Sequence, residues 1–453
     1  MNNITLKSHP DSARTAGRNA GDMVDDRIED GVFRVDRSVY TDRDIFAQEL
    51  ARIFTRTWVF LCHESQVPEP GDYFSTYIGE QPVFVIRGKD GEVRSFLNAC
   101  AHRGAVLTPR RQGRALTLTC RFHGWCFNAE GRCTKIKNEK EGWPEASIRS
   151  EMSLKPVARV ASYRGFVFGC LDPDVADLET SLAGAKEFID LLADQSPEGL
   201  EVVSGSSDYI IRGNWKMQAE NGVDGYHVGT VHRVFASAMA NREQRDGVEG
   251  VRKTEAGRIA GGVPTGCYDL GQGHMMIWAG RSTPEAAPLW EARDRLLATY
   301  PEGKVRWMIE RGRNLCLFPN VLLMDQPSTQ IRVFRPLDVD RTLVSVYCIA
   351  PKGESPEARA ARLRKFEDFY MVTGMATPDD LAALEDCESG AKATGARWND
   401  MTRGLATMTE GPDEVAAELG AKPVTSNSCW DFETLYHGFY RRWSELMTET
   451  QEG

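Results

Sequence analysis

Two pairs of metal-binding side chains stand in the first third of the chain and constrain its fold most. Cys100 and His102 form the first pair, and Cys120 and His123 form the second, with seventeen residues between the pairs. Each pair offers one thiolate and one imidazole, which suits a two-iron two-sulfur cluster whose irons bind two cysteines and two histidines respectively. A zinc finger usually takes its thiolates from one turn and its imidazoles from another. The spacing therefore favours an iron–sulfur cofactor, with structural zinc as the alternative.

The sequence around these pairs predicts a small β domain. Val83–Arg87 and Val93–Leu97 flank a Gly-Lys-Asp-Gly turn and are expected to form a hairpin. A second turn, Asn128–Gly131, follows the second pair. Gly104 and Gly124 come directly after the pairs, where glycine lets a loop turn close to a cluster. The four residues are therefore expected on loops held by short strands.

Composition excludes several classes of protein. A chain of 453 residues exceeds one hydrophobic core, so two domains are expected. A net charge of −10 argues against a nucleic-acid partner, and no apolar stretch approaches the roughly 20 residues that span a bilayer. The polar opening has no apolar core segment, so no secretory signal is expected, and eleven cysteines without framework spacing indicate reduced thiols. We therefore expect a cytoplasmic protein without a membrane span.

The rest of the chain predicts an α+β fold. Residues up to about 35 are polar and are expected to be poorly ordered, and a helix begins near Thr41, with Thr41 and Asp44 as a capping box. Further along, helices alternate with runs of strands that predict a curved antiparallel sheet covered by helices. The expected units are an N-terminal tail and helix (1–55) that packs on the catalytic domain, an iron–sulfur domain (56–170) and a catalytic domain (171–453). The residues expected to form the main helices and strands of the last unit are 181–193, 200–212, 321–324, 330–335, 343–349, a helix from Ser355 and 432–447.

A second metal site is predicted near residue 230. Asp224 and His227 lie three residues apart, so on a helix the carboxylate can hold one imidazole nitrogen while the other binds metal. His227 and His232 would point about 140° apart on a straight helix, so shared ligation requires a break, which Gly229 allows. Two histidines and one acid form the facial triad of non-haem Fe(II) oxygenases.

The missing acid is expected in the segment Thr377-Pro378-Asp379-Asp380. Its simpler interpretation is a helix start, with Thr377 as N-cap, Pro378 in the first turn, and acids that favour the positive end of the helix dipole. The residues alone leave both interpretations open. The histidine pair has the stronger case, since an iron–sulfur cluster supplies electrons that need a destination.

Several longer strings make the chain resemble a known family. It is similar to the large (alpha) subunits of Rieske non-haem-iron aromatic-ring-hydroxylating dioxygenases, within the benzoate, toluate and anthranilate group. The resemblance covers nearly the whole chain. Beyond the cysteine–histidine pairs, the strings that carry it are Gly213-Asn214-Trp215-Lys216, Glu220-Asn221-Gly222, Asp224-Gly225-Tyr226-His227-Val228, Met308-Ile309-Glu310-Arg311, Gly374-Met375-Ala376-Thr377-Pro378-Asp379-Asp380-Leu381 and Trp398-Asn399-Asp400-Met401.

The resemblance implies a role for each candidate residue. Asp224 would bridge an iron-binding histidine and a cluster histidine of an adjacent subunit, which implies a homotrimer, usually with a small beta subunit. Asp380 matches the third iron ligand, and Asp379 is the second choice. The ligands that it implies are Cys100, His102, Cys120 and His123 for the cluster, and His227, His232 and Asp380 for a mononuclear iron.

The implied reaction inserts dioxygen into an aromatic ring. The expected substrate is a benzoate-like carboxylate, the product a cis-dihydrodiol, and the electrons come from NADH through a reductase or ferredoxin. The alternatives are a Rieske monooxygenase acting on salicylate or anthranilate, and a Rieske electron carrier, which the chain's length opposes. After His232 the chain departs from the aromatic residues of many benzoate-type members with Arg233-Val234-Phe235. Arg233 either approaches a substrate carboxylate or is a solvated helix residue, which we favour.

Overall fold

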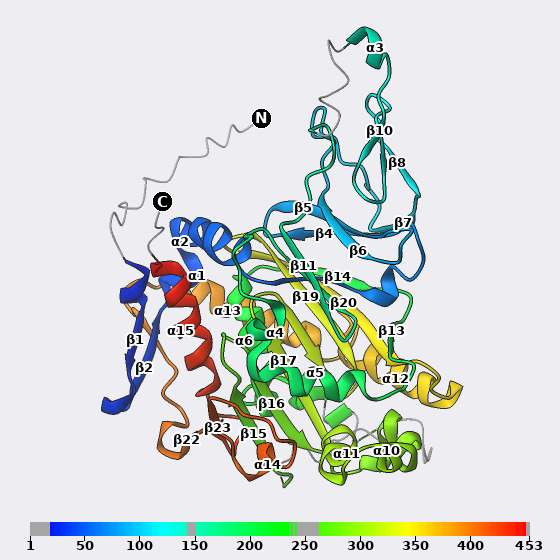
Figure 1. Cartoon of the computed structure of the whole chain (residues 1–453). Coiled ribbons are helices and arrows are strands. Elements are labelled where there is room, and N and C mark those ends of the chain that lie inside the picture. Colours follow the sequence, from blue (N-terminus) through cyan, green and yellow to red (C-terminus); the bar gives the residue numbers. More distant parts are fainter. Residues whose placement is uncertain (1–18, 143–150, 236, 239–240, 242–261, 450–453) are drawn as a thin grey trace, which may run out of the picture.

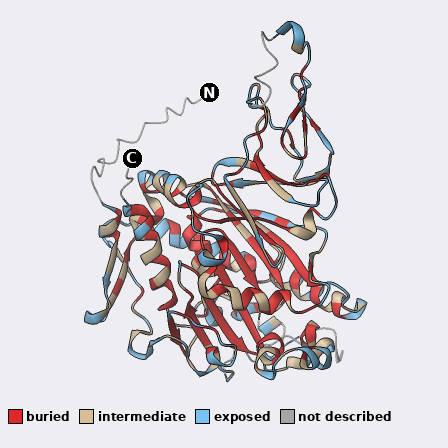
Figure 2. Cartoon of the chain, in the orientation of Figure 1, coloured by how far each residue is buried: buried red, intermediate tan, exposed pale blue. Residues whose placement is uncertain are grey.

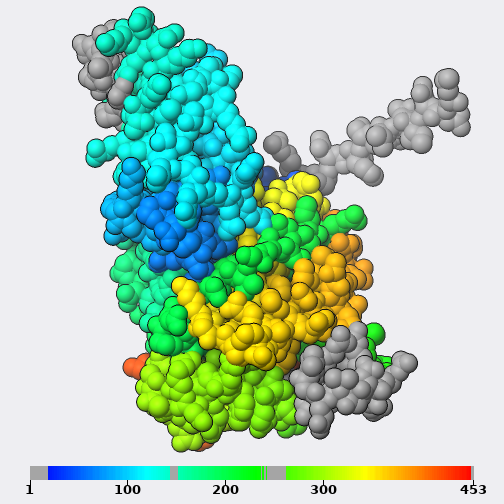
Figure 3. All heavy atoms as spheres, turned by 90° about the vertical axis from the view of Figure 1, so that its right-hand side faces the viewer, coloured from blue at the N-terminus to red at the C-terminus, as the bar shows by residue number. Residues whose placement is uncertain are grey.

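The computed structural model describes residues 19–142, 151–235, 237–238, 241 and 262–449 (Figure 1). A small β-rich domain projects from a larger body built on one sheet. Figure 3 shows this projection, blue to cyan, rising above the green and yellow residues of the body. Buried residues concentrate in the sheet and the helices of the body (Figure 2).

The β-rich domain contains three small antiparallel sheets, ordered β6-β5-β4-β7, β10-β9-β8 and β11-β12-β3. The expected hairpin is present, with Arg87 of β5 paired with Val93 of β6. The apolar residues at its outer end form their own core, which includes Cys100 and Cys120, whereas β3 and β12 join the core of the body. Its elements are β3 (Val59–His63), η4 (Glu64–Gln66), β4 (Asp72–Ile78), β5 (Gln81–Arg87), β6 (Val93–Leu97), β7 (Gln112–Arg114), β8 (Thr117–Thr119), β9 (Cys126–Asn128), β10 (Cys133–Lys135), α3 (Glu139–Gly142), β11 (Arg159–Tyr163) and β12 (Phe166–Cys170).

The body is organised around a ten-stranded sheet of order β13-β20-β19-β18-β17-β16-β15-β23-β22, with β14 also paired to β20. Every described pairing in it is antiparallel, which confirms the predicted α+β class. Its strands are β13 (Leu200–Val202), β14 (Ser207–Ile211), β15 (Thr265–Asp269), β16 (Met275–Gly280), β17 (Arg311–Leu317), β18 (Val321–Met324), β19 (Gln330–Asp338), β20 (Arg341–Pro351), β22 (Thr409–Glu410) and β23 (Thr425–Asn427).

Helices cover this sheet, and one of the predicted helices is interrupted. Ser355 caps α12 as predicted, since its hydroxyl accepts from the Ala358 N–H. The helix expected over 181–193 is broken at Ala183, whose φ of 44° is left-handed. The main helices are α4 (Leu178–Leu182), α5 (Lys186–Ala193), α6 (Trp215–Asn221), α7 (Val228–Val231), α10 (Arg293–Thr299), α11 (Glu302–Ile309), α12 (Pro356–Phe369), α13 (Thr377–Ala391), α14 (Glu414–Ala417) and α15 (Leu435–Thr448). Within the described part of the chain, none has the length and apolarity that a membrane span requires.

Residues 24–36 are more ordered than predicted from their polarity, while the first eighteen residues of the segment lie outside the described part of the chain. A hairpin forms before residue 36, and β2 pairs with β21 (Trp398–Asp400), so order comes from a strand far along the chain. The predicted capping box at Thr41 is wrong, because the Asp42 carboxylate accepts from the N–H groups of Asp44 and Ile45. The described elements are η1 (Ala20–Met23), β1 (Val24–Arg27), η2 (Ile28–Asp30), β2 (Val32–Asp36), α1 (Ser38–Thr41), α2 (Arg43–Glu49) and η3 (Leu50–Phe54).

Candidate functional site

The two cysteine–histidine pairs lie on two loops with the same backbone pattern. The first loop joins β6 to β7, and the second joins β8 to β9. In each loop the cysteine N–H donates to the carbonyl five residues later, that of Ala105 or Trp125, and a glycine N–H returns to the cysteine carbonyl. These glycines, Gly104 and Gly124, have φ of 69° and 74°. Their left-handed conformation explains why glycine follows each pair.

The side chains of the four residues face one another in like pairs. The Nδ1 atoms of His102 and His123 lie 3.1 Å apart, and the His102 ring stacks on Trp125 at 4.8 Å. Cys100 and Cys120 are buried, and burial followed by their mutual contact raises the pKa of the Cys100 thiol.

This arrangement fits a two-iron cluster better than a single ion. Sulfur faces sulfur and nitrogen faces nitrogen, yet among the residues that the structure describes no three of the four ligand atoms lie within 4.8 Å of one another. A tetrahedral zinc site needs all four ligand atoms around one ion. The residues therefore fit a cluster with one sulfur-ligated and one nitrogen-ligated iron.

The second predicted site forms where α6, α7 and α13 meet. α7 is a single turn that begins after His227 and ends before His232, so the two imidazoles flank it. The helix break that shared ligation requires therefore lies at the ends of this turn and not at Gly229. α13 places Asp380 opposite the histidines, in its first turn. Its N-cap is Ala376 and not Thr377, whose hydroxyl instead donates to the Tyr370 carbonyl.

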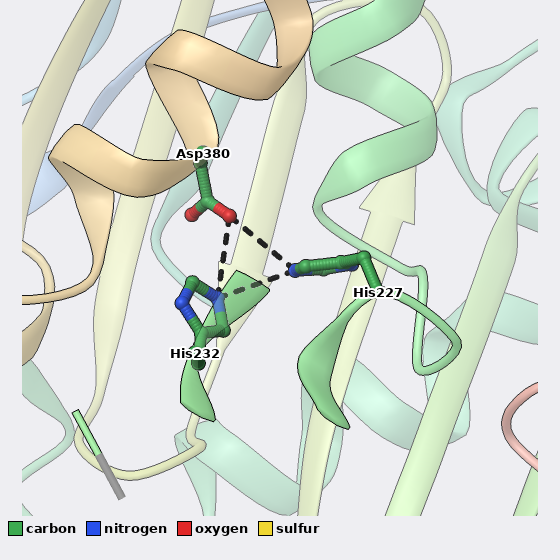
Figure 4. Close-up of side chains that lie close together, drawn as sticks. All are labelled: His227, His232 and Asp380. Carbon is green, nitrogen blue, oxygen red and sulfur yellow. Dashed lines mark hydrogen bonds and ion pairs between the residues drawn. The ribbon is translucent and has the colours of Figure 1, made fainter. Parts of the chain in front are cut away.

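His227, His232 and Asp380 converge on one point (Figure 4). The two Nε2 atoms lie 3.2 Å apart, and the Asp380 Oδ1 atom lies 3.4 Å from the first and 3.2 Å from the second. Among the described residues, this is the sole group of three such side chains whose ligand atoms all lie within 4.8 Å of one another. Asp380 is 8% exposed, whereas the neighbouring Asp379 is outside the group. The structure thus brings the predicted histidines together with Asp380.

Asp224 lies behind this group, as its three-residue spacing predicts. Its Oδ2 atom is 3.1 Å from the His227 Nδ1 atom, so the opposite nitrogen of the ring points at Asp380. Burial lowers the pKa of His227, but its hydrogen bonds with Asp224 and Asp380 outweigh burial and raise the pKa to about 10. Burial opposes ionisation of Asp380, yet both histidines hold its pKa below the usual range. The group therefore retains a proton that a bound divalent cation would displace, which fits a metal site.

A cavity of about 390 Å³ opens on the Asp224 side of His227. Glu220 lies in its wall, accepts hydrogen bonds from the hydroxyls of Tyr40 and Tyr440, and has a pKa that burial raises to about 7. Glu433 and Tyr436 also line it, and neither was predicted from the sequence. They come from the far end of the chain and carry no motif, so no local signal marked them.

Arg233 is exposed in the helical segment that begins after His232, as expected for a solvated helix residue. Phe235 is buried and its ring packs on Phe369 at 5.0 Å, while Phe369 also contacts the His232 ring at 5.3 Å. The wall beside His232 is therefore aromatic. A metal triad with an apolar wall, in a chain that also has a separate domain with cluster-type loops, is typical of non-haem iron oxygenases that receive electrons one at a time.

Comparisons with known proteins agree with this class. Residues 57–163 match the Rieske [2Fe-2S] domain, and residues 198–449 match the ring hydroxylating alpha subunit (catalytic domain). The chain is 46% identical over 427 residues to the alpha subunit of toluate 1,2-dioxygenase from Pseudomonas putida, covering 94% of this chain and 93% of that protein. It is 43% identical over 419 residues to the large subunit of 2-halobenzoate 1,2-dioxygenase from Burkholderia cepacia, covering 92% of this chain and 90% of that protein.

A solved structure of naphthalene 1,2-dioxygenase with indole bound has the same fold, with a TM-score of 0.81 and 27% identity, covering 95% of each chain. The chain therefore belongs to the alpha subunits of Rieske-type aromatic-ring-hydroxylating dioxygenases. It is an oxidoreductase with a Rieske [2Fe-2S] domain, and its catalytic domain is of the family that binds mononuclear non-haem iron and takes electrons from a separate reductase.

Proposed function

We propose that this chain is the terminal oxygenase component that dihydroxylates a benzoate-like carboxylate to a cis-dihydrodiol. The observation that carries the proposal is the convergence of His227, His232 and Asp380 in a chain that also bears the paired cluster loops. The toluate and halobenzoate enzymes that it resembles over nearly their whole length are named for benzoate-type acids, which supports the substrate class.

The residues of the two sites would hold different iron centres. The cluster would be held by Cys100, Cys120, His102 and His123, and the mononuclear Fe(II) by His227, His232 and Asp380. When bound, these groups supply one-electron transfer and a coordination site for dioxygen beside the ring. A facial set of three protein ligands leaves the opposite positions open, which is what a second reactant requires.

The chain itself orients the ligands and excludes water. The Asp224 carboxylate lies 3.1 Å from the His227 Nδ1 atom, where it favours the tautomer that presents Nε2 to the metal. Phe235 and Phe369 form an apolar wall beside His232 and keep solvent away from it. A flat aromatic ring packs well against such a wall, since aromatic rings prefer offset or edge-to-face contacts.

The assembly is proposed as a homotrimer in which one subunit's cluster faces its neighbour's Asp224. Exposed apolar side chains on the outer domain support this proposal, because they would be buried if the domain docked on another protein surface. They are Val106, Leu116 and Phe122, which is 60% exposed and contacts the His123 ring. A small beta subunit and a reductase or ferredoxin would complete the system. None of the eleven cysteines forms a disulfide, which suits the cytoplasm, where NADH is present.

Oxygen-uptake assays with a panel of substituted benzoates and a reductase test this function. With labelled dioxygen we expect two labelled oxygens in one diol. A single labelled hydroxyl would favour the monooxygenase alternative, acting on salicylate or anthranilate. Absence of any hydroxylated product, with electrons still passing through the cluster, would favour an electron carrier.

A further inference from the structure

Arg332 is a buried cation without a protein counter-ion among the described residues. Four arginines of the described chain are buried, and three of them pair with acids: Arg311 with Glu418, Arg313 with Asp325, and Arg362 with Glu354. Arg332 is 3% exposed, its Nε atom has no hydrogen-bond partner, and no acid of the described residues lies within ion-pairing distance of it. A buried charge is strongly unfavourable unless an opposite charge accompanies it. An anion from outside the chain would fill that role.

The position of Arg332 connects it to the proposed iron site. Its guanidinium lies over the Tyr370 ring, 5.7 Å from the centroid. Tyr370 contacts Phe369 at 5.0 Å, and Phe369 contacts the ring of His232. The rings of Tyr370 and Phe369 therefore connect Arg332 to His232, one of the proposed iron ligands.

Arg332 also lies on the face of the sheet that α6 covers. It is paired across β18 and β19 with Leu322, and Leu322 packs directly against Gly222 at the end of α6. The segment after Gly222 leads to Asp224 and His227. Arg335, three residues along the same strand, faces the outer domain instead, where its guanidinium stacks on Tyr77 at 3.2 Å.

Polar atoms without partners gather on the same side of the sheet. Gln330 is fully buried two residues before Arg332, and its Oε1 atom has no hydrogen-bond partner among the described residues. Gln218, on α6, likewise has a buried Nε2 atom without a described partner. Buried polar atoms are nearly always hydrogen-bonded in folded proteins, so the unpaired acceptor of Gln330, the unpaired donor of Gln218 and the unpaired cation of Arg332 mark a place for a polar ligand.

We propose that Arg332 receives the carboxylate of the substrate and so selects aromatic acids over neutral aromatics. The inference rests on the proposed function, because it assigns the substrate's charged group to that same site. A guanidinium presents two parallel N–H donors that match a carboxylate, and in a buried setting such a pair is strong and specific. The aromatic wall of Phe369 and Tyr370 would then lie along the ring of the bound acid.

Equilibrium binding to the metal-loaded protein tests the inference. Calorimetric titration under anaerobic conditions would compare benzoate with benzamide, which has a similar shape and no charge. We expect Arg332→Met to weaken benzoate binding roughly 10- to 100-fold, the worth of a charge-assisted hydrogen bond, while benzamide binding stays nearly constant. Arg332→Lys keeps the charge without the planar fork and is expected to fall between the two.

Two matched controls separate recognition from a structural role. Arg335→Met removes a cation from the opposite face of the same strand, and Arg233→Met removes an exposed one next to His232. Both are expected to bind benzoate like the wild type. Thermal unfolding and the visible spectrum of the cluster should be unchanged in Arg332→Met, because removing an uncompensated buried charge does not destabilise the fold.

The outcomes distinguish this inference from the function on which it rests. If the wild type and Arg332→Met bind benzoate with the same affinity, the inference about Arg332 is overturned, whereas the proposed function is not affected. An equal loss of benzoate and benzamide binding in Arg332→Met would also overturn it, since that pattern indicates packing. Wild-type protein that binds benzamide but none of the benzoates would overturn the proposed substrate class and the inference with it.

Discussion

The buried ion pair between Glu49 and Lys216 gives the sharpest stability prediction. Both side chains are fully buried, and the Glu49 Oε1 atom lies 2.5 Å from the Lys216 Nζ atom. Glu49 also accepts hydrogen bonds from the indoles of Trp215 and Trp443, at 2.8 and 2.7 Å. One carboxylate therefore joins α2, α6 and α15. Because α6 leads into the segment of Asp224 and His227, this contact also positions the proposed iron site.

We predict that Lys216→Met lowers the free energy of unfolding by about 3 to 5 kcal/mol, the cost of leaving one partner of a buried pair uncompensated. Adding Glu49→Gln to Lys216→Met should restore part of that loss, because the remaining buried group no longer carries a charge. The amide oxygen of the new side chain can still accept from one of the two indoles.

Urea unfolding followed by tryptophan fluorescence measures the free energy of unfolding of Lys216→Met and of the double variant. The single Glu49→Gln variant completes the double-mutant cycle. We expect a coupling free energy of roughly 2 kcal/mol or more, within the range seen for residues in contact. Exposed Arg43→Met is the matched control, since its ion pair with Asp338 lies at the surface and should contribute less than about 1 kcal/mol. Additive effects of the two core substitutions would refute the reasoning.

Three further predictions concern electron transfer, assembly and pH. Asp224→Asn should keep both metals yet slow reduction of the mononuclear iron, and a normal single-turnover rate in the variant would reject the coupling role. Phe122→Ser should weaken subunit association in sedimentation while the visible spectrum of the cluster persists, whereas an unchanged oligomer would exclude Phe122 from the interface. Burial lowers the pKa of His274 to about 4, below its unfolded value of about 6.5, so the unfolded chain binds the proton more tightly. Stability should therefore fall by about 3 kcal/mol as the pH decreases from about 6.5 to about 4, and His274→Gln should remove that part of the slope in urea unfolding at a series of pH values.

The sequence predicted best those features whose signal is local. The strand expected at 321–324 agrees with β18, and Ser355 caps α12, because alternation of apolar residues and capping chemistry act over a few residues. The cysteine–histidine loops were found for the same reason. Their glycines and ligands follow at fixed offsets, so the pattern is visible without knowledge of the surrounding fold.

Features that depend on distant contacts were predicted poorly. The hairpin of β1 and β2 was missed because its partner β21 lies more than 350 residues along the chain, and polarity alone suggested disorder. The interruption at Ala183 has no sequence signal, since alanine rarely adopts a left-handed φ and only the contacts around it can hold it there.

The predicted iron site combines features that the sequence could predict with features that it could not. Sequence spacing named His227 and His232 and required a helix break, but it could not choose between Asp379 and Asp380 from the residues alone. The packing of α13 places Asp380, and not Asp379, beside the two histidines. Arg332 was missed for a related reason. The local sequence around an arginine in a strand does not show whether its side chain is buried or whether an acidic side chain pairs with it. Arg233 was considered as a substrate ligand only because it directly follows His232.

Counting iron and acid-labile sulfide per chain tests the central claim most directly, because the claim is that a two-iron cluster and a separate iron occupy different residues. The account predicts three irons and two sulfides in the wild type, and two of each in Asp380→Ala, with the spectrum of the histidine-ligated cluster unchanged. Two irons per chain in the wild type, or loss of cluster sulfide in Asp380→Ala, would contradict it.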